Sequence, residues 1–468
     1  MRRWRMRGAA LTLLALGTTL GCGPATTRDD AKGAGAGSGG VVVSEEGSDD
    51  GEKLDLGPGH GRDPDERPSL DVLVVIDDGP SMLAEQTHLG RNLLGFANGL
   101  GMVLDGCGSP FPLDTHVMVT HTSIGGACER DSGGAPVSTP CSDRLEDFVG
   151  ADGQDAAAAC MAACPEPVSI DGEWIAFFEE SNNIDAPPPA DLDGDGTPES
   201  DVARALGCLG MQGVSGCAFG SPLEAMRRAL DPSASWNTGP EPFLRDDAAL
   251  AIAIVTDGLD CAGASAALAD PTLWEVDPAT GRPAPSEAAC WNGGVQCDGP
   301  DAAGVYTGCQ PADGPLTDVD AYVQFLADLR DGEDKRIVML GTVGVPLVTE
   351  HSPQSPFEPI AGGFGALEVH DWSELDLAPG DAAAGLGVAD KEFELGIGPG
   401  CTALTRSGDT VGQGVPPIRI AEVCKSLDEE PDDGWPRVHC CLESICDETS
   451  NLGHGCIYTL SAPWMTCE

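Results

Sequence analysis

An apolar run that stops at a carboxylate constrains the fold of this chain more than any other stretch. Residues 72–76 read Val-Leu-Val-Val-Ile and lead into Asp77, a Gly-Pro turn and Ser81. Such a run predicts a strand buried on both faces of a sheet, and residues 83–100 predict a helix after it. A strand, a polar turn and a helix form the opening unit of a doubly wound α/β domain, in which ligands bind beyond the carboxyl ends of the strands.

A second apolar strand ends in the same way. Residues 249–256 read Ala-Leu-Ala-Ile-Ala-Ile-Val-Thr and are followed by Asp257. In a parallel sheet Asp77 and Asp257 would meet at the crevice where the strand order reverses, and two carboxylates there need a cation or a proton between them. Ser81 lies four residues after Asp77 and can face the same cation, because hard cations prefer oxygen ligands.

A Gly-Ser-Pro turn before a later helix offers another hydroxyl. Ser221 precedes Pro222, and Glu224 follows three residues after Ser221, which is the pattern of a capping box at a helix start. Capping alone would account for Ser221, but its hydroxyl can also serve as a cation ligand. Both roles stay open from the sequence.

Two further runs, residues 115–122 and 336–341, predict additional strands. His116 and His121 would lie on opposite faces of the first of these strands, so we do not expect them to form a metal pair. Together the runs predict an α/β fold with a doubly wound, mostly parallel, Rossmann-like sheet.

The two strands that end in aspartate resemble the von Willebrand factor type A (vWA) family. In that family the first strand ends in Asp-x-Ser-x-Ser and forms a metal-ion-dependent adhesion site. Here the triplet is Asp77, Gly79 and Ser81, so one family hydroxyl is missing. The resemblance covers roughly residues 67–347, with long insertions at about 124–216 and 261–314.

The resemblance implies a site for Mg²⁺ or Mn²⁺. Ser81 and Ser221 would bind the ion directly, Asp77 and Asp257 would act largely through waters, and an open coordination position would receive a carboxylate of the ligand. It also implies a cell-surface binding or adhesion module that recognises a protein or an extracellular-matrix ligand.

Two other functions compete with this interpretation. One is a metal-free structural or envelope-assembly lipoprotein with a degenerate site. The other is a metal-dependent hydrolase, which we consider less favoured because the sequence has no Gly-x-Ser-x-Gly or His-Glu-x-x-His motif and no histidine near either aspartate motif along the chain. We therefore expect a protein that is not an enzyme.

An acidic stretch within the first insertion resembles half of a calcium loop. Carboxylates alternate along it and are followed by glycine, as in the first half of an EF-hand loop. The candidate calcium ligands are Asp191, Asp193, Asp195 and Glu199. Val202 occupies the position where an EF-hand needs a bidentate glutamate, so a solvated acidic loop is the alternative.

The N-terminal segment predicts export. Residues 1–21 combine an arginine-rich start with an apolar core, as signal peptides do. The Leu-Gly-Cys sequence that ends at Cys22 resembles a bacterial lipobox, which implies lipidation of Cys22 and a cell-envelope location. The outer membrane is favoured because Gly23 follows the cysteine, and secretion is the alternative. Residues 22–66 are acidic and rich in Gly and Ser, and predict a flexible tether.

Cysteine usage agrees with an oxidising compartment. Of 19 cysteines, 18 follow Cys22, which allows up to nine disulfides. Seven of them fall in residues 348–468, a Cys-rich region that either completes the domain or stands apart from it.

The charge of the chain limits its partners. A formal net charge of −51 argues against nucleic acid and anionic lipid surfaces, because both are polyanions. We therefore expect membrane contact only through a lipid anchor.

Overall fold

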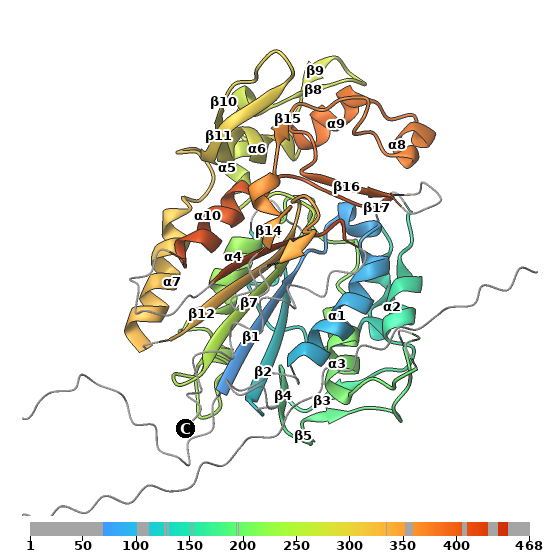
Figure 1. Cartoon of the computed structure of the whole chain (residues 1–468), viewed down its shortest axis with the longest axis vertical. Helices are drawn as coiled ribbons and strands as arrows, with labels where there is room; N and C mark the ends of the chain where they lie inside the picture. Colours follow the sequence, from blue (N-terminus) through green and yellow to red (C-terminus); the bar gives the residue numbers. More distant parts are fainter. Residues whose placement is uncertain are drawn as a thin grey trace, which may run out of the picture. The chain divides into compact units, whose positions relative to one another are not determined.

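A mostly parallel sheet of seven strands lies at the centre of the described part of the chain (Figure 1). The computed structural model describes residues 69–447 except 101–111, 126–127, 129–130, 151–152, 193, 195, 334, 352–358, 405–409 and 429–438. The strand order is β18 (Cys440–Ser444), β12 (Ile337–Val343), β7 (Ala249–Val255), β1 (Ser69–Ile76), β2 (Asp114–His121), β4 (Ile175–Phe178) and β5 (Ser181–Asn182). The first five are parallel to one another, whereas β4 and β5 each run antiparallel to the strand before them.

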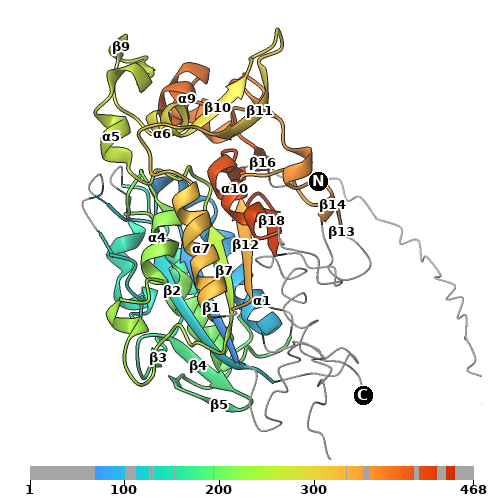
Figure 2. The ribbon, with the colours of Figure 1, turned by 90° about the vertical axis from the view of Figure 1, so that its left-hand side faces the viewer.

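Helices cover both faces of this sheet (Figures 1 and 2). One face carries α1 (Gln86–Leu100), α2 (Ala157–Ala163) and α3 (Asp201–Gly210). The other carries α4 (Pro222–Ala229), α7 (Asp320–Glu333) and α10 (Ile418–Ser426). Alternate residues of β1 enter the two cores, Val72 and Val74 on the α1 face and Leu73 and Val75 on the α4 face, which explains why the run has no polar positions.

The strand order reverses between β1 and β7. From β1 the chain proceeds outward through β2 and β4, then returns to β7 on the other side of β1 and proceeds to β12 and β18. Ile76 pairs with Val255 in the parallel register, so β1 and β7 end side by side. The mixed α/β fold with a mostly parallel sheet is thus confirmed, and its switch point lies where the two aspartate motifs begin.

Smaller elements surround this framework. They include η1 (Pro80–Leu83), β3 (Ser169–Ile170), β6 (Ile184–Asp185), α5 (Ala264–Leu268), β8 (Val276–Asp277), β9 (Arg282–Pro283), α6 (Ala288–Gly294), β10 (Val295–Asp298), β11 (Val305–Pro311), β13 (Glu350–His351), β14 (Pro359–Ala361), β15 (Val369–His370), α8 (Pro379–Ala384), α9 (Val388–Leu395), β16 (Cys401–Leu404) and β17 (Thr410–Gly414). A third apolar cluster joins the second insertion to the C-terminal region through Cys261, Cys290, Ile397 and Val415.

Disulfides are numerous, as the sequence predicts. Seven connect described residues: Cys128–Cys217, Cys141–Cys160, Cys164–Cys208, Cys261–Cys290, Cys297–Cys309, Cys401–Cys446 and Cys424–Cys440. The first joins the loop after β2 to the loop before α4, and the last two hold β18 against its surroundings.

The C-terminal region supplies parts of the central layer. β18 extends the sheet beside β12, and α10 packs on the sheet with α7.

The helix predicted from residue 83 begins instead at Gln86, because Pro80–Leu83 form the 3₁₀ turn η1.

Several expectations fall on residues that the structure does not describe. The signal peptide at 1–21, Cys22, the tether at 22–66, and the calcium-loop residues Asp193 and Asp195 lie outside the described residues. Across the described ranges, every helix is too short or too polar to span a bilayer.

Candidate functional site

The structure brings three of the predicted site residues together at the carboxyl ends of β1 and β7. Asp77 directly follows β1, and its backbone N–H donates to Val255 O at 2.8 Å, which continues the pairing of the two strands. Ser81, in the 3₁₀ turn after β1, donates its hydroxyl to Asp257 Oδ1 at 2.8 Å. Asp77 and Asp257 are both buried, each with 4 % of its surface exposed.

Hydroxyls from two neighbouring strands orient Asp77. Thr122, after β2, donates to Asp77 Oδ1 at 2.8 Å, and Thr256, after β7, donates a short hydrogen bond to Asp77 Oδ2. The Gly79 N–H also donates to Oδ1, at 2.9 Å. Sequence reasoning missed both threonines, although each stands directly after a strand at the same edge of the sheet, which is the signal that would have identified them.

Gly79, where the vWA motif has a hydroxyl, lies in a narrow space. A β-carbon on Gly79 would stand 3.1 Å from Asp77 Oδ1 and 3.3 Å from Cys217 O. A side chain at this position would crowd the aspartate. The missing hydroxyl therefore corresponds to a close approach of the backbone to Asp77.

Ser221 is buried near the site, but its predicted capping role is wrong. Its hydroxyl donates to Phe219 O at 3.4 Å and makes no capping hydrogen bond to α4. The Leu223 N–H at the helix start is instead satisfied by Asp260 Oδ1 at 3.2 Å. The residue that lies against Asp77 is Gly220, whose β-carbon would stand 3.5 Å from both Asp77 carboxylate oxygens.

Glu224, the other half of the predicted capping box, turns away from the Ser221 backbone. It accepts hydrogen bonds from Arg227 at 2.6 and 2.9 Å and from Arg228 at 2.8 Å. Glu224 therefore pairs with two arginines that follow it by one helical turn, instead of forming the capping box.

Two further carboxyls that sequence reasoning missed belong to the same region. Glu287 immediately precedes α6, and its Oε1 and Asp77 Oδ2 both lie 3.5 Å from the position of a β-carbon on Gly258. Glu85 immediately precedes α1 and is 6 % exposed. Nothing in the sequence pattern separates either residue from an ordinary surface glutamate.

Burial and mutual repulsion raise the pKa of all four carboxyls. Burial is the largest cause for each, and it raises the pKa of Glu85 to about 8. The charges that act most strongly on these carboxyls are those of other carboxylates: Glu85 and Asp77 raise the pKa of Asp257, and Asp77 raises that of Glu287. The site therefore favours protons or a cation.

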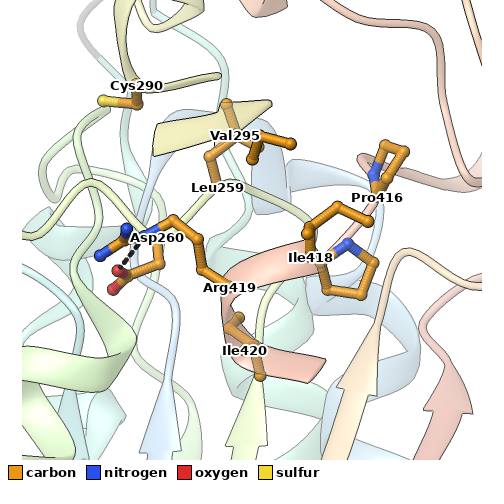
Figure 3. Close-up of a pocket in the computed structure, with 9 residues that line it drawn as sticks. Leu259, Asp260, Cys290, Val295, Pro416, Ile418, Arg419 and Ile420 are labelled. Carbon is orange, nitrogen blue, oxygen red and sulfur yellow. Dashed lines mark hydrogen bonds and ion pairs between the residues drawn. The ribbon is translucent and has the colours of Figure 1, made fainter. Parts of the chain in front are cut away.

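Two other buried carboxyls of the protein have cationic partners. Asp71 lies 2.8 Å from Arg245, and Asp260 lies 3.0 Å from Arg419. Figure 3 shows the second pair beside a cavity of about 10 Å³, large enough for at most one water. The carboxyls around Asp77 thus differ from Asp71 and Asp260, each of which is paired with an arginine.

No histidine lies near the aspartate motifs along the sequence, but one lies near the first motif in the folded structure. His121 Nδ1 lies 3.0 Å from Asp78 Oδ2, because β2 ends beside β1. Ser123 donates to Asp78 Oδ1 at 2.8 Å, so the aspartate lies between the histidine and the serine. A hydrolytic triad needs the imidazole in contact with the nucleophilic hydroxyl, which is not the order of this cluster.

The acidic loop of the first insertion is closed by its own hydrogen bonds. Asp191 accepts from the N–H groups of Gly194 at 2.7 Å and Gly196 at 3.0 Å, and Glu199 accepts from Leu192 N at 3.1 Å. Asp191 and Glu199 thus stand near each other in a hydrogen-bonded turn, and the calcium loop remains a prediction. In the described ranges no group of three or more His, Cys, Asp or Glu side chains is arranged to hold a metal.

The residues around Asp77 nevertheless fit a hydrated hard cation. Asp77, Asp257 and Ser81 offer oxygen atoms only, and Glu85 Oε2 is buried without a hydrogen-bond partner. Mg²⁺ is commonly held by one or two carboxylates and keeps several waters, so a cage of many side chains is not required.

Comparisons of this chain with protein-family models, with curated proteins and with solved structures find no match.

Proposed function

We propose that the described domain is a vWA-like binding module that uses a divalent cation at the ends of β1 and β7. The observation that carries the proposal is the convergence of Asp77, Ser81 and Asp257 at the switch point of the sheet, among carboxyls whose strongest charged neighbours are also acidic. The strand order supports it, because ligands of doubly wound sheets bind in this crevice.

The ligand class follows from the charge of a cation with an open position. Mg²⁺ or Mn²⁺ bound to two carboxylates and a hydroxyl retains exchangeable waters, and a ligand carboxylate can replace one of them. A protein or extracellular-matrix segment with an exposed Asp or Glu is therefore the proposed ligand. Cys217 directly follows the first insertion and Glu287 lies within the second. Both stand beside the site, so the insertions would provide the surrounding specificity.

The proposed location is the cell envelope, with a lipid anchor at Cys22, and it is supported by the lipobox-like sequence and by the disulfides. A free secreted form is the alternative. The proposal assigns no catalytic role to the protein.

The first experiment measures cation binding. Calorimetric titration of Mg²⁺ and Mn²⁺ into chelator-treated full-length protein should give a saturable signal, which Asp257→Asn should remove because the carboxylate that accepts from Ser81 is neutralised. Folding of the variant is checked by circular dichroism. Equal, absent heats in both proteins would overturn the proposal and favour the metal-free structural role.

The second part of that experiment addresses the ligand. Peptides that each carry a single Asp or Glu are probed with wild-type protein, with Mn²⁺ and then with chelator. Binding should depend on Mn²⁺ and be lost in Asp257→Asn. Binding that persists in chelator would show recognition without the cation.

A further inference from the structure

The Glu85 side chain has a buried oxygen with no donor. Its Oε1 accepts a hydrogen bond from the Gln413 N–H at 3.1 Å, whereas its Oε2 is buried without a partner. An acceptor removed from water without a hydrogen bond costs stability, and such groups in native proteins point to a bound water or ion. Among the described residues, no group therefore donates a hydrogen bond to Glu85 Oε2.

One short segment links Glu85 to the candidate cation site. The N–H of Gln413 binds Glu85, and the N–H of Val415, two residues later, donates to Asp257 O at 2.8 Å. Two residues of extended chain span roughly 7 Å, so the Glu85 carboxyl and the backbone carbonyl of Asp257 are bound by donors about that far apart on the same segment. In agreement, Glu85 is the charge that most strongly raises the pKa of Asp257.

A hydrated cation supplies the donor that Glu85 lacks. Mg²⁺ and Mn²⁺ keep bound waters, and each such water is a strong hydrogen-bond donor. The described residues form no cage of three acidic side chains, so the place left for Glu85 is outside the direct ligands. The close approach of Gly79 to Asp77 leaves no room for a side-chain hydroxyl there, so water would have to fill that share of the coordination of a bound cation.

We propose that Glu85 is an outer carboxylate of the cation site, whose Oε2 accepts a hydrogen bond from a water bound to the cation at Asp77, Ser81 and Asp257. This assignment rests on the proposed function and extends it to a residue outside the vWA motif. Glu85 is a positioning residue: a nearby cation favours its charged form, and in that form it would hold a bound water and increase cation affinity.

The test compares three variants of the full chain by calorimetric titration with Mn²⁺ alone. Glu85→Gln keeps the shape of the side chain and removes its charge, and it should lower Mn²⁺ affinity at least about tenfold. Glu241→Gln removes an exposed carboxyl and should leave the affinity unchanged. Asp257→Asn should abolish binding.

The outcomes separate this inference from the proposed function. If Asp257→Asn loses binding while Glu85→Gln matches wild type, the role of Glu85 is overturned and the cation site stands. If wild-type protein binds no Mn²⁺, both fail. A second measurement, the number of waters on bound Mn²⁺ by electron–nuclear double resonance, should show a changed hydration signal in Glu85→Gln, which a purely structural role would not produce.

Glu85→Asp covers the case in which Glu85→Gln does not fold. It keeps the charge but shortens the side chain by one methylene, so it should bind Mn²⁺ more weakly than wild type and show the same altered hydration signal. Wild-type affinity together with a wild-type hydration signal in Glu85→Asp would count against the proposal.

Discussion

His116 shows how a single buried side chain sets a pH limit on this protein. It lies on β2 against Trp174, with ring centroids 5.7 Å apart, and its Nδ1 is buried without a hydrogen-bond partner. Burial, helped by the positive charge of Arg245, lowers the pKa of His116 to about 4. The folded protein therefore holds this histidine neutral under conditions in which the unfolded chain takes up a proton.

We expect His116 to destabilise the fold in mild acid. Its folded pKa lies below the unfolded value of 6.5, so its contribution to stability is present above pH 6.5 and is lost as the pH falls toward 4. Relative to His116→Gln, the wild-type protein should lose up to about 3 kcal/mol of unfolding free energy over this range. Urea unfolding of both proteins at pH 7 and pH 4 measures the difference, and a constant difference would contradict the assignment.

At the residue scale, apolar runs predicted the site better than polar residues did. Asp77 and Asp257 were predictable because each ends a buried strand. The role of Thr122 was not predictable, because a threonine after a strand is common. Its contact with Asp77 depends on β2 ending level with β1. The burial of Glu85 was not predictable either, because a helix expected from residue 83 would place Glu85 in its exposed first turn.

Asp260 connects three elements around the second aspartate motif. It pairs with Arg419 of α10 (Figure 3). It also satisfies the Leu223 N–H at the start of α4, and Arg419 donates to Thr317 O at 2.6 Å. Both members of the pair are almost fully buried. The pair therefore fastens the C-terminal helix to the loop that carries Asp257.

Breaking this pair should be costly. Arg419→Ala leaves the Asp260 charge buried and uncompensated, and should lower the unfolding free energy by about 3–5 kcal/mol. Arg227→Ala is the matched control: it also removes an arginine paired with a carboxylate, but one whose side chain is 43 % exposed, so its cost should stay near 0–1 kcal/mol. Denaturant unfolding compares them, and equal losses would contradict the role of burial.

At the element scale, strands were predicted more accurately than helix starts. β1, β2, β7 and β12 appear where apolar runs stand in the sequence, because a strand buried on both faces leaves a continuous signal. The start of α4 was predicted with the wrong cap, because Asp260 is distant in sequence and its approach depends on the parallel packing of β7. β18 was not predicted, since a short strand among cysteines has no distinctive pattern.

The whole molecule carries an excess of negative charge, with 76 acidic and 25 basic residues. Like charges at this density repel one another in the compact state, and salt screens that repulsion. Raising the ionic strength from about 0.01 M to about 0.1 M shortens the screening length from about 30 Å to about 10 Å.

We therefore expect NaCl to stabilise the chelator-treated protein. The melting temperature in calorimetry should rise by several degrees between those salt concentrations, because self-repulsion is lost. Chelator keeps divalent ions from contributing. A melting temperature that is constant or falls with NaCl would show that local pairing outweighs the net charge.

The segment at the end of β17 also completes the hydrogen bonding around Glu85 and Asp257. Glu85 and Asp257 precede Gln413 and Val415 in the sequence, and the N–H groups of Gln413 and Val415 donate hydrogen bonds to them. A ribosome that starts at the first residue must add more than 150 residues beyond Asp257 before these contacts form, and β18 closes the sheet later still. Chains that stop before Gln413 therefore carry Glu85 and Asp257 without the backbone N–H groups that bind them in the folded protein.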